Sequence, residues 1–142
     1  MVYPEPILFT VPISKPNFFS WVYDSLKSTT SIKVVDDQIS NPAWLELLSD
    51  FIFKCIILNS SGVYHFGSED YISRYDFAKQ IAKIFDLDSS LIYPVKTSDL
   101  SFNAPRPMHS GLLTEKILNE FDIQIQPTSY CLRSIQQKVN IL

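Results

Sequence analysis

Residues 31–42 read Ser-Ile-Lys-Val-Val-Asp-Asp-Gln-Ile-Ser-Asn-Pro, and the rest of the chain can be understood from this stretch outward. Residues 32–35 predict a short strand, which stops at two carboxylates and an amide. The turn that follows closes at Pro42, where a very apolar helix is expected to begin. A strand end, a polar turn and a helix start together form the place at which α/β proteins bind ligands. The first candidate site residues are therefore Asp36, Asp37 and Gln38.

Asp36 and Asp37 lie next to each other at the end of this expected strand. Adjacent side chains of an extended chain point to opposite faces. One carboxylate can then accept hydrogen bonds from amides of the turn while the other faces a pocket. The sequence leaves open whether the pair only caps the turn or also contacts a ligand.

Composition indicates one globular domain over residues 1–142, with enough apolar residues for a core. Of these residues 46% are hydrophobic and 19% are charged. The net charge of −3, without a basic stripe, argues against nucleic-acid binding. The three glycines include no pair at G-x-G spacing, so the chain has no dinucleotide fingerprint and no P-loop of its own.

The two cysteines, Cys55 and Cys131, lie in apolar helical patterns. Such residues are usually buried free thiols of a reducing compartment, so we expect a cytoplasmic location. Residues 1–6 lack the features of a signal peptide, and no apolar window is long enough for a membrane span. We therefore expect no membrane partner.

Strands and helices are expected to alternate along the chain, which predicts an α/β fold. Apolar runs between turn residues indicate strands, and apolar residues at helical spacing after a capping residue indicate helices. The expected strands are residues 7–11, 32–35, 63–66 and 91–95, and the expected helices are residues 18–27, 43–58, 74–85, 115–121 and 129–139. The expected helix caps are Asn17, either Asp70 or Ser73, Thr114 and Thr128.

The helix expected at residues 43–58 is apolar nearly all round, with a narrow polar stripe of Glu46, Asp50 and Lys54. Asp50 and Lys54 are spaced to form an ion pair. A helix of this kind is buried on more than one side. Either it is central in the fold, or part of it faces something that this chain does not contain.

Residues 96–112 form a long segment without periodicity, and Arg106 lies in it between two prolines. Long loops inside a compact domain are usually functional or disordered, and the prolines favour a positioned side chain. A guanidinium there can grip a diphosphate with two hydrogen bonds, or form a structural ion pair or a carbonyl clamp. His65, at the end of an expected strand, is either a core-edge histidine or a pocket residue.

Two further patterns favour structural roles. Tyr75 and Lys79 match Tyr-x-x-x-Lys, the spacing of the proton donor and lysine in short-chain reductases. Tyr75 shares a helix face with apolar residues, which indicates a core aromatic side chain instead. His65 and His109 have no cysteine or carboxylate at metal-ligand spacing, so no metal site is expected.

Four short motifs, taken together in order and spacing, resemble the C-terminal half of the dTDP-4-dehydrorhamnose reductase family. They are Val-Val-Asp-Asp-Gln-x-x-x-Pro at 34–42, Gly-Val-Tyr-His-Phe-Gly at 62–67, Ser-x-x-x-Phe-Ala-x-x-Ile at 73–81 and Ala-x-Arg-Pro-x-x-Ser-x-Leu-x-Thr-x-Lys at 104–116. Asn17-Phe18 before the first helix also fits. The resemblance covers the chain from about residue 7 to its end.

The resemblance implies an extended Rossmann-type reductase that uses NADPH, or sometimes NADH, to reduce the 4-keto group of a dTDP-deoxysugar for polysaccharide synthesis. It implies few short, mainly parallel strands with about five helices here, without the dinucleotide-binding half. Residues 7–13 resemble a late strand of the Rossmann sheet, and residues 14–142 resemble the substrate-binding region. The family's catalytic tyrosine lies upstream, so Tyr75 and Lys79 match by chance. The implied substrate-binding residues are Asp36, Asp37, Gln38, His65, Arg106 and Ser110.

The chain also departs from the family. Residues 11–14 read Val-Pro-Ile-Ser where the family usually has Ser/Thr-Trp-x-Tyr-Gly, whose aromatic side chains line the sugar site. Ala43 and Leu47 replace the usual threonine and acid. Part of the family's sugar contacts is therefore missing, and which deoxysugar would be bound stays open.

We therefore expect the substrate-binding portion of a nucleotide-sugar reductase, which binds no cofactor alone. Hydride transfer needs a bound nicotinamide, so this portion should not catalyse the reduction by itself. Its implied partners are a nucleotide-sugar and either a separate Rossmann-half chain or a second copy held by exposed apolar surface. The alternative is a non-catalytic module similar to the regulatory β subunit of methionine adenosyltransferase.

Overall fold

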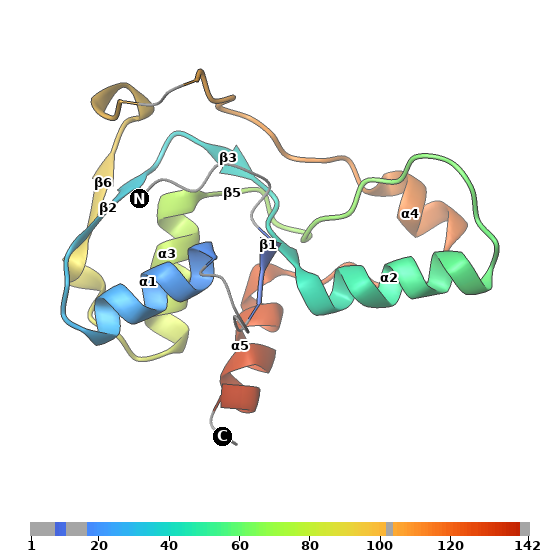
Figure 1. Ribbon diagram of the computed structural model, residues 1–142, viewed down its shortest axis with the longest axis horizontal. Helices are drawn as coiled ribbons and strands as arrows, with labels where there is room; N and C mark the ends of the chain where they lie inside the picture. The colour runs from blue at the N-terminus through green and yellow to red at the C-terminus, as the bar shows by residue number, and fades with distance from the viewer. Residues whose placement is uncertain (1–7, 11–16, 102–103, 140–142) are drawn as a thin grey trace.

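Short strands and helices alternate in the computed structural model, which describes residues 8–10, 17–101 and 104–139 (Figure 1). The strands are β1 (Leu8–Phe9), β2 (Ile32–Val35), β3 (Ile39–Ser40), β4 (Ala43–Trp44), β5 (Ile72–Ser73) and β6 (Ile92–Val95). The helices are α1 (Phe18–Lys27), α2 (Leu45–Ile57), α3 (Arg74–Ile84), α4 (Glu115–Glu120) and α5 (Thr128–Val139), with 3-10 turns η1 (Ser89–Leu91) and η2 (Thr97–Asp99). This confirms the expected α/β fold, with five α-helices in the described part of the chain.

The strands pair in twos, and two of these three pairs within the described residues are parallel. β1 runs parallel to β4, and β2 runs parallel to β6 with Ile32 opposite Ile92. β3 and β5 are antiparallel, with Ile39 opposite Ser73. The strand expected at residues 7–11 is observed as β1, while Ile7 and Val11 lie outside the described residues.

The main core lies between α1, α3, α5 and the β2–β6 pair (Figure 1). Phe77 of α3 is fully buried at its centre. Its ring lies 5.0 Å from that of Phe9 in β1 and 5.6 Å from that of Phe18 in α1. Leu132 and Ile135 of α5 complete this core and are also fully buried.

Side-chain caps fix where the helices of this core begin. The Asn17 side chain accepts from the Ser20 amide at 3.1 Å, and the Ser20 hydroxyl accepts from the Asn17 amide at 2.9 Å, which forms a capping box before α1. Ser73 caps α3 by accepting from the Asp76 amide at 3.0 Å. Thr114, which the sequence also suggested as a cap, makes no capping hydrogen bond with its side chain.

Asp70 serves a different helix from the one expected. Its carboxylate accepts from the backbone amide of Thr128 at 3.0 Å, at the start of α5, and also from the Thr128 hydroxyl. Thr128 is completely buried, and its hydroxyl also contacts the Gln80 side chain at 2.8 Å. Asp70 therefore attaches α5 to the segment before α3 instead of capping α3.

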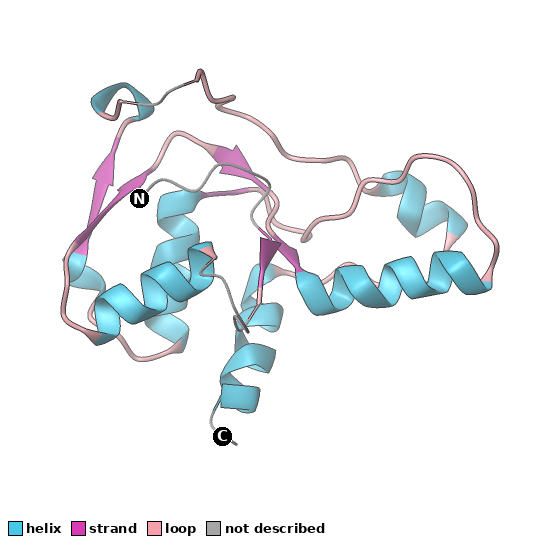
Figure 2. Cartoon of the chain, in the orientation of Figure 1, coloured by secondary structure: helices cyan, strands magenta, loops and turns pink. Residues whose placement is uncertain are grey.

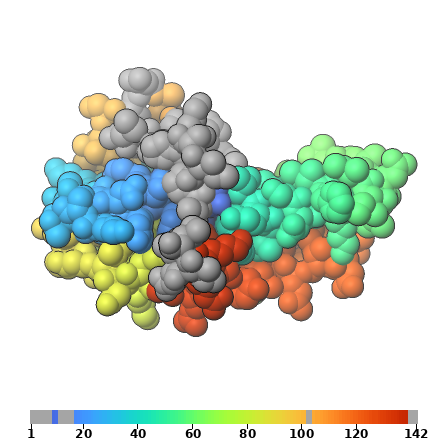
Figure 3. All heavy atoms as spheres, turned by 60° about the horizontal axis from the view of Figure 1, so that its bottom comes forward, coloured from blue at the N-terminus to red at the C-terminus, as the bar shows by residue number. Residues whose placement is uncertain are grey.

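Helix α2 and helix α4 form a second lobe, which extends to one side of the main core (Figure 3). Phe51 is the buried residue of α2, and its ring lies 5.1 Å from that of Phe121 at the end of α4. Tyr64 and Phe66 pack against the same cluster. Apart from this aromatic contact, α2 presents much of its surface to solvent.

Two expectations for this lobe are wrong. The helix begins at Leu45 and not at residue 43, because Ala43–Trp44 pair with β1 as strand β4. Residues 63–66 are irregular and not a strand, since Tyr64 and Phe66 pack on Phe51 and the Val63 carbonyl accepts from the Lys116 ammonium at 3.0 Å. His65 is therefore not at a strand end.

The apolar surface of α2 is not covered within the described residues. Lys54 does not pair with Asp50 but donates to the backbone carbonyl of Asp122. The exposed apolar side chains are Ile52 (50%), Phe53 (64%), Ile56 (70%), Ile57 (65%) and, at the helix end, Leu58 (56%). Within the described residues the helix is therefore not central in the fold, and the other explanation, that part of it faces something absent from the chain, stays a prediction.

Candidate functional site

The candidate site lies where β2 and β6 end. These strands are parallel, so their carboxyl ends lie at the same edge, and the Asp36 amide continues the pairing by donating to the Val95 carbonyl at 3.1 Å. Asp36 and Asp37 follow β2, while Lys96 and Thr97 follow β6. The edge therefore brings two carboxylates next to an ammonium and a hydroxyl.

Asp37 acts as a turn cap. Its carboxylate accepts from the Thr97 amide at 2.9 Å and from the Thr97 hydroxyl at 2.6 Å. Partial burial acts to raise its pKa, but the side-chain and backbone hydrogen bonds from Thr97 outweigh it, so the pKa of Asp37 is held below its ordinary value. The structure thus supports the capping interpretation for Asp37.

Asp36 is paired with Lys96 across the same edge. The Lys96 ammonium lies 2.9 Å from its carboxylate, and the hydrogen bond between them raises the pKa of Lys96. The Lys96 side chain is 60% exposed and that of Asp36 is 29% exposed, so solvent screens the pair and it contributes little to stability. A role of Asp36 toward a ligand stays a prediction.

Gln38 is buried and connects three elements. Its amide nitrogen donates to the Thr97 hydroxyl at 3.1 Å, and its amide oxygen accepts from Nε of Arg74 at 3.2 Å. Its backbone carbonyl accepts from the Arg74 amide, also at 3.2 Å. Gln38 therefore links the end of β2 to η2 and to the first residue of α3.

Arg74 is a member of the site that the sequence did not indicate. Its guanidinium carbon lies 5.7 Å from the centroid of the Phe18 ring, and its side chain is half-buried. Burial, and the nearby charge of Arg106, lower its pKa. The signal that could have revealed Arg74 is its position directly after Ser73, the residue that caps α3 and pairs with Ile39.

Arg106 lies on the segment that runs from the end of β6 past β3 toward α4 (Figure 2). This segment pairs with β3: the Ile39 amide donates to the Met108 carbonyl at 2.7 Å, and the Ser110 amide donates to the Ile39 carbonyl at 2.9 Å. Arg106 is half-buried, and its Nε is buried without a hydrogen-bond partner among the described residues. Arg106 lies near enough to Arg74 for its charge to lower the Arg74 pKa, and a positioned role toward a diphosphate stays a prediction.

The six residues predicted from sequence are only partly brought together. Asp37 and Gln38 share Thr97, and Ser110 is attached to β3 by its backbone while its side chain is exposed. His65 lies in the irregular segment after α2, with an exposed side chain and no hydrogen bond to the described residues. No contact in this part of the structure connects it to Gln38.

Asn41 is a buried structural residue that the sequence reading also missed. Its side chain accepts from the Leu112 amide at 2.8 Å and donates to the Leu112 carbonyl at 3.0 Å, with a third hydrogen bond to the Ser68 carbonyl. A Cβ atom on Gly67 would lie 2.4 Å from the Asn41 amide nitrogen. Asn41 and Gly67 therefore fix the segment that carries Arg106 and Ser110.

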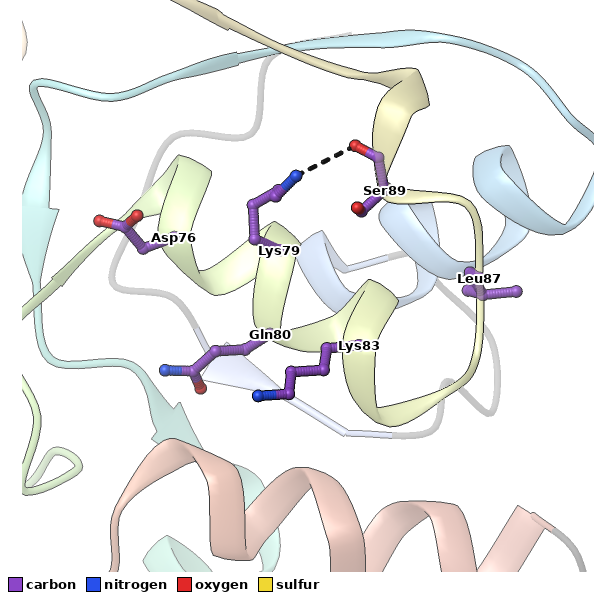
Figure 4. A pocket seen from close by; sticks show the side chains of 6 residues that line it. All are labelled: Asp76, Lys79, Gln80, Lys83, Leu87 and Ser89. Carbon is purple, nitrogen blue, oxygen red and sulfur yellow. Dashed lines mark hydrogen bonds between the residues drawn. The ribbon is translucent and has the colours of Figure 1, made fainter.

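Tyr75 and Lys79 are not arranged as a catalytic pair. Figure 4 shows Lys79 at a shallow pocket beside α3 and η1, where its ammonium donates to the Ser89 carbonyl at 3.3 Å. Tyr75 instead packs against the main core. Among the described residues no cluster of His, Cys, Asp and Glu could hold a metal ion, and none of the helices there could cross a membrane.

Comparison with known proteins gives the family of the chain. The family described as "RmlD substrate binding domain" matches residues 6–141. Spore coat polysaccharide biosynthesis protein SpsK of Bacillus subtilis is 25% identical over 122 residues, which is 86% of this chain and 42% of that protein. The dTDP-4-dehydrorhamnose reductase of Aggregatibacter actinomycetemcomitans is 28% identical over 131 residues, or 84% of this chain and 45% of that enzyme.

Solved structures give the same result. The dTDP-4-dehydrorhamnose reductase of Bacillus anthracis, in complex with NADP, superposes with a TM-score of 0.84 at 26% identity, over 93% of this chain and 46% of that one. The enzyme from Yersinia enterocolitica gives a TM-score of 0.81 at 26% identity, over 90% of this chain and 45% of that one. The chain spans somewhat less than half the length of these relatives. It belongs to the RmlD substrate-binding domain family.

Proposed function

We propose that this chain is the substrate-binding portion of a nucleotide-sugar reductase and that it binds a dTDP-deoxysugar through its diphosphate. Three of the proteins above are dTDP-4-dehydrorhamnose reductases, one of which was solved with NADP. The observation that carries the proposal is the buried Nε of Arg106, which has no hydrogen-bond partner among the described residues. Buried polar groups are normally paired, so a ligand oxygen is the partner that this donor needs.

The residues of the site divide into two groups under this proposal. Asp37 and Gln38 do not contact the ligand but position other residues, because their side chains form hydrogen bonds with Thr97 and Arg74. Arg106 contacts the diphosphate directly. The partly buried side chain of Asp36 and the exposed side chains of His65 and Ser110 remain the candidates for contacts to the sugar or the base.

NADPH does not fit the described residues of this chain. A dinucleotide needs a glycine-rich turn whose backbone can approach the pyrophosphate. The space beside Gly67 is filled by the Asn41 side chain and that beside Gly111 by the Tyr71 side chain. A Cβ atom added to these glycines would lie 2.4 Å and 2.2 Å, respectively, from those side chains. The hydride donor would therefore be held by a part that this chain does not supply, and NADPH with a dTDP-4-keto-sugar should give no turnover on the pure chain.

Calorimetric titration with dTDP and dTDP-rhamnose tests the proposal. We expect both to bind, and we expect Arg106→Ala to weaken binding by about 1.5–3 kcal/mol, the usual contribution of hydrogen bonds to a charged group. Arg133→Ala is the matched control, because Arg133 is exposed on α5, away from this site. Equal affinity of wild type and Arg106→Ala, or no binding by the wild type, would contradict the proposal.

The apolar face of α2 favours a second candidate, a binding module that acts through a partner chain. This face is exposed within the described structure. The same titration separates the candidates, because a module that has lost its ligand site would bind neither nucleotide.

A further inference from the structure

We infer that Arg74 is a specificity-determining residue of the same site, which pairs with Arg106 to select a diphosphate over a monophosphate. The inference rests on the proposed function, since it concerns the group that Arg106 would contact. It goes beyond that function by assigning a second guanidinium to the site.

A chain of hydrogen bonds holds Arg74 in one orientation. The Thr97 hydroxyl donates to the Asp37 carboxylate at 2.6 Å and accepts from the Gln38 side-chain amide at 3.1 Å. The amide oxygen of Gln38 in turn accepts from Nε of Arg74 at 3.2 Å. The Phe18 ring lies against the guanidinium from α1. Nε is the only guanidinium nitrogen of Arg74 with a hydrogen bond among the described residues, so the two terminal nitrogens can donate two hydrogen bonds to an oxyanion.

Arg74 and Arg106 approach the site from opposite edges of β3. The carbonyl of Gln38 accepts from the Arg74 amide on the β5 side. Both backbone groups of the next residue, Ile39, pair with the segment that carries Arg106 on the other side. Successive residues of an extended chain direct their backbone groups to opposite edges, so the backbone of residues 38–39 runs between the two segments that carry the arginines.

The two guanidiniums lack a protein anion within the described residues. The ion pairs found there are Asp36–Lys96 and Glu46–Lys138, and neither includes an arginine. The carboxylates of Asp37 and Asp76 are bound to Thr97 and Ser73. Arg74 also occupies the first position of α3, where the positive end of the helix dipole disfavours a cation.

This arrangement is unfavourable without a ligand and favourable with one. Two like charges, both of them half-buried, destabilise the free chain. A diphosphate carries negative charge on two phosphoryl groups and can accept two hydrogen bonds from each guanidinium. A monophosphate can satisfy one guanidinium fully but leaves the other without a full partner, so the pair should prefer a diphosphate.

The experiment compares Arg74→Met and Arg74→Lys with the wild type, using dTDP, dTMP and inorganic pyrophosphate as probes. Binding is measured by calorimetry, and the melting temperature is measured without ligand. We expect Arg74→Met to leave the ligand-free melting temperature unchanged or raised, and to weaken dTDP and pyrophosphate binding by about tenfold or more. Binding of dTMP should change by less than about threefold, and Arg74→Lys should recover part of the dTDP affinity.

Each outcome decides the inference. A lower ligand-free melting temperature in Arg74→Met, with equal losses for dTDP and dTMP, would show that Arg74 only holds Gln38 and would overturn it. An unchanged preference for dTDP over dTMP would overturn it too, as would a wild type that binds no pyrophosphate. If pyrophosphate binding depends on Arg74 but dTDP-rhamnose binds no better than pyrophosphate, the proposed function fails while the inference stands.

Discussion

The apolar face of α2 predicts that the isolated chain associates with itself. Ile52, Phe53, Ile56 and Ile57 follow helical spacing on one face, with Leu58 at its end, and each is at least half exposed. Complete burial of one such side chain contributes about 1.5–3 kcal/mol, so covering the exposed parts of all five contributes about 5–9 kcal/mol. A symmetric pair buries the face twice, which gives about 10–18 kcal/mol against about 4–15 kcal/mol for lost freedom of motion. The midpoints of the two ranges differ by about 4–5 kcal/mol, which predicts association with a Kd of roughly a millimolar or somewhat below.

The perturbation is the double variant Phe53→Glu/Ile56→Glu. Both side chains are exposed, at 64% and 70%, so the fold of the single chain does not depend on burying them. Sedimentation velocity as a function of chain concentration should show association of the wild type and a monomer for the double variant. Leu113→Glu is the matched control, because Leu113 is 69% exposed but lies outside α2. A wild-type monomer that melts cooperatively at all concentrations would refute the reasoning, as would a double variant that associates like the wild type.

Three other predictions concern single residues. Asp37→Asn should lower the free energy of unfolding by about 1.5 kcal/mol at neutral pH by weakening the hydrogen bonds to Thr97. Because folding lowers the pKa of Asp37, the stability that its carboxylate contributes is present above the ordinary carboxyl pKa and is lost as the pH falls through the folded pKa. Melting temperatures of the wild type and Asp37→Asn should therefore converge in acid. Gly67→Ala should lower the free energy of unfolding by about 1–3 kcal/mol in denaturant titrations, because the new methyl group overlaps the Asn41 amide, whereas Ser61→Ala at an exposed turn should not create this overlap. Burial raises the pKa of the Cys131 thiol to about 12, so mass spectrometry after brief treatment with iodoacetamide should find Cys55 modified and Cys131 intact, and equal modification of both would contradict the structure.

Local patterns of the sequence were sufficient where the structure depends on neighbouring residues. Strand β2 has the expected bounds, because its apolar run ends at two carboxylates. The first residues of α1 and α3 follow from the caps Asn17 and Ser73. Arg106 was indicated by its two flanking prolines, and its Nε is buried without a hydrogen-bond partner among the described residues.

Long-range contacts explain what the sequence did not reveal. Ala43 and Trp44 form a strand because they pair with β1, whose residues lie far earlier in the chain. Tyr64 and Phe66 look like strand residues but are held by Phe51 and the end of α4, which leaves His65 exposed. Arg74 resembles an ordinary surface residue of a helix until Gln38, 36 residues earlier, is known to hold its guanidinium.

The central claim is that a nucleotide diphosphate binds between Arg74 and Arg106. Titration of the isotope-labelled chain with dTDP, followed by nuclear magnetic resonance, tests it most directly, with thymidine as the control that lacks phosphate. The account predicts that dTDP shifts the side-chain signals of both arginines and the backbone amide signals of Thr97 and Ile39, and that thymidine leaves the arginine signals in place. Arginine signals that do not move with dTDP, or that move equally with thymidine, would contradict it.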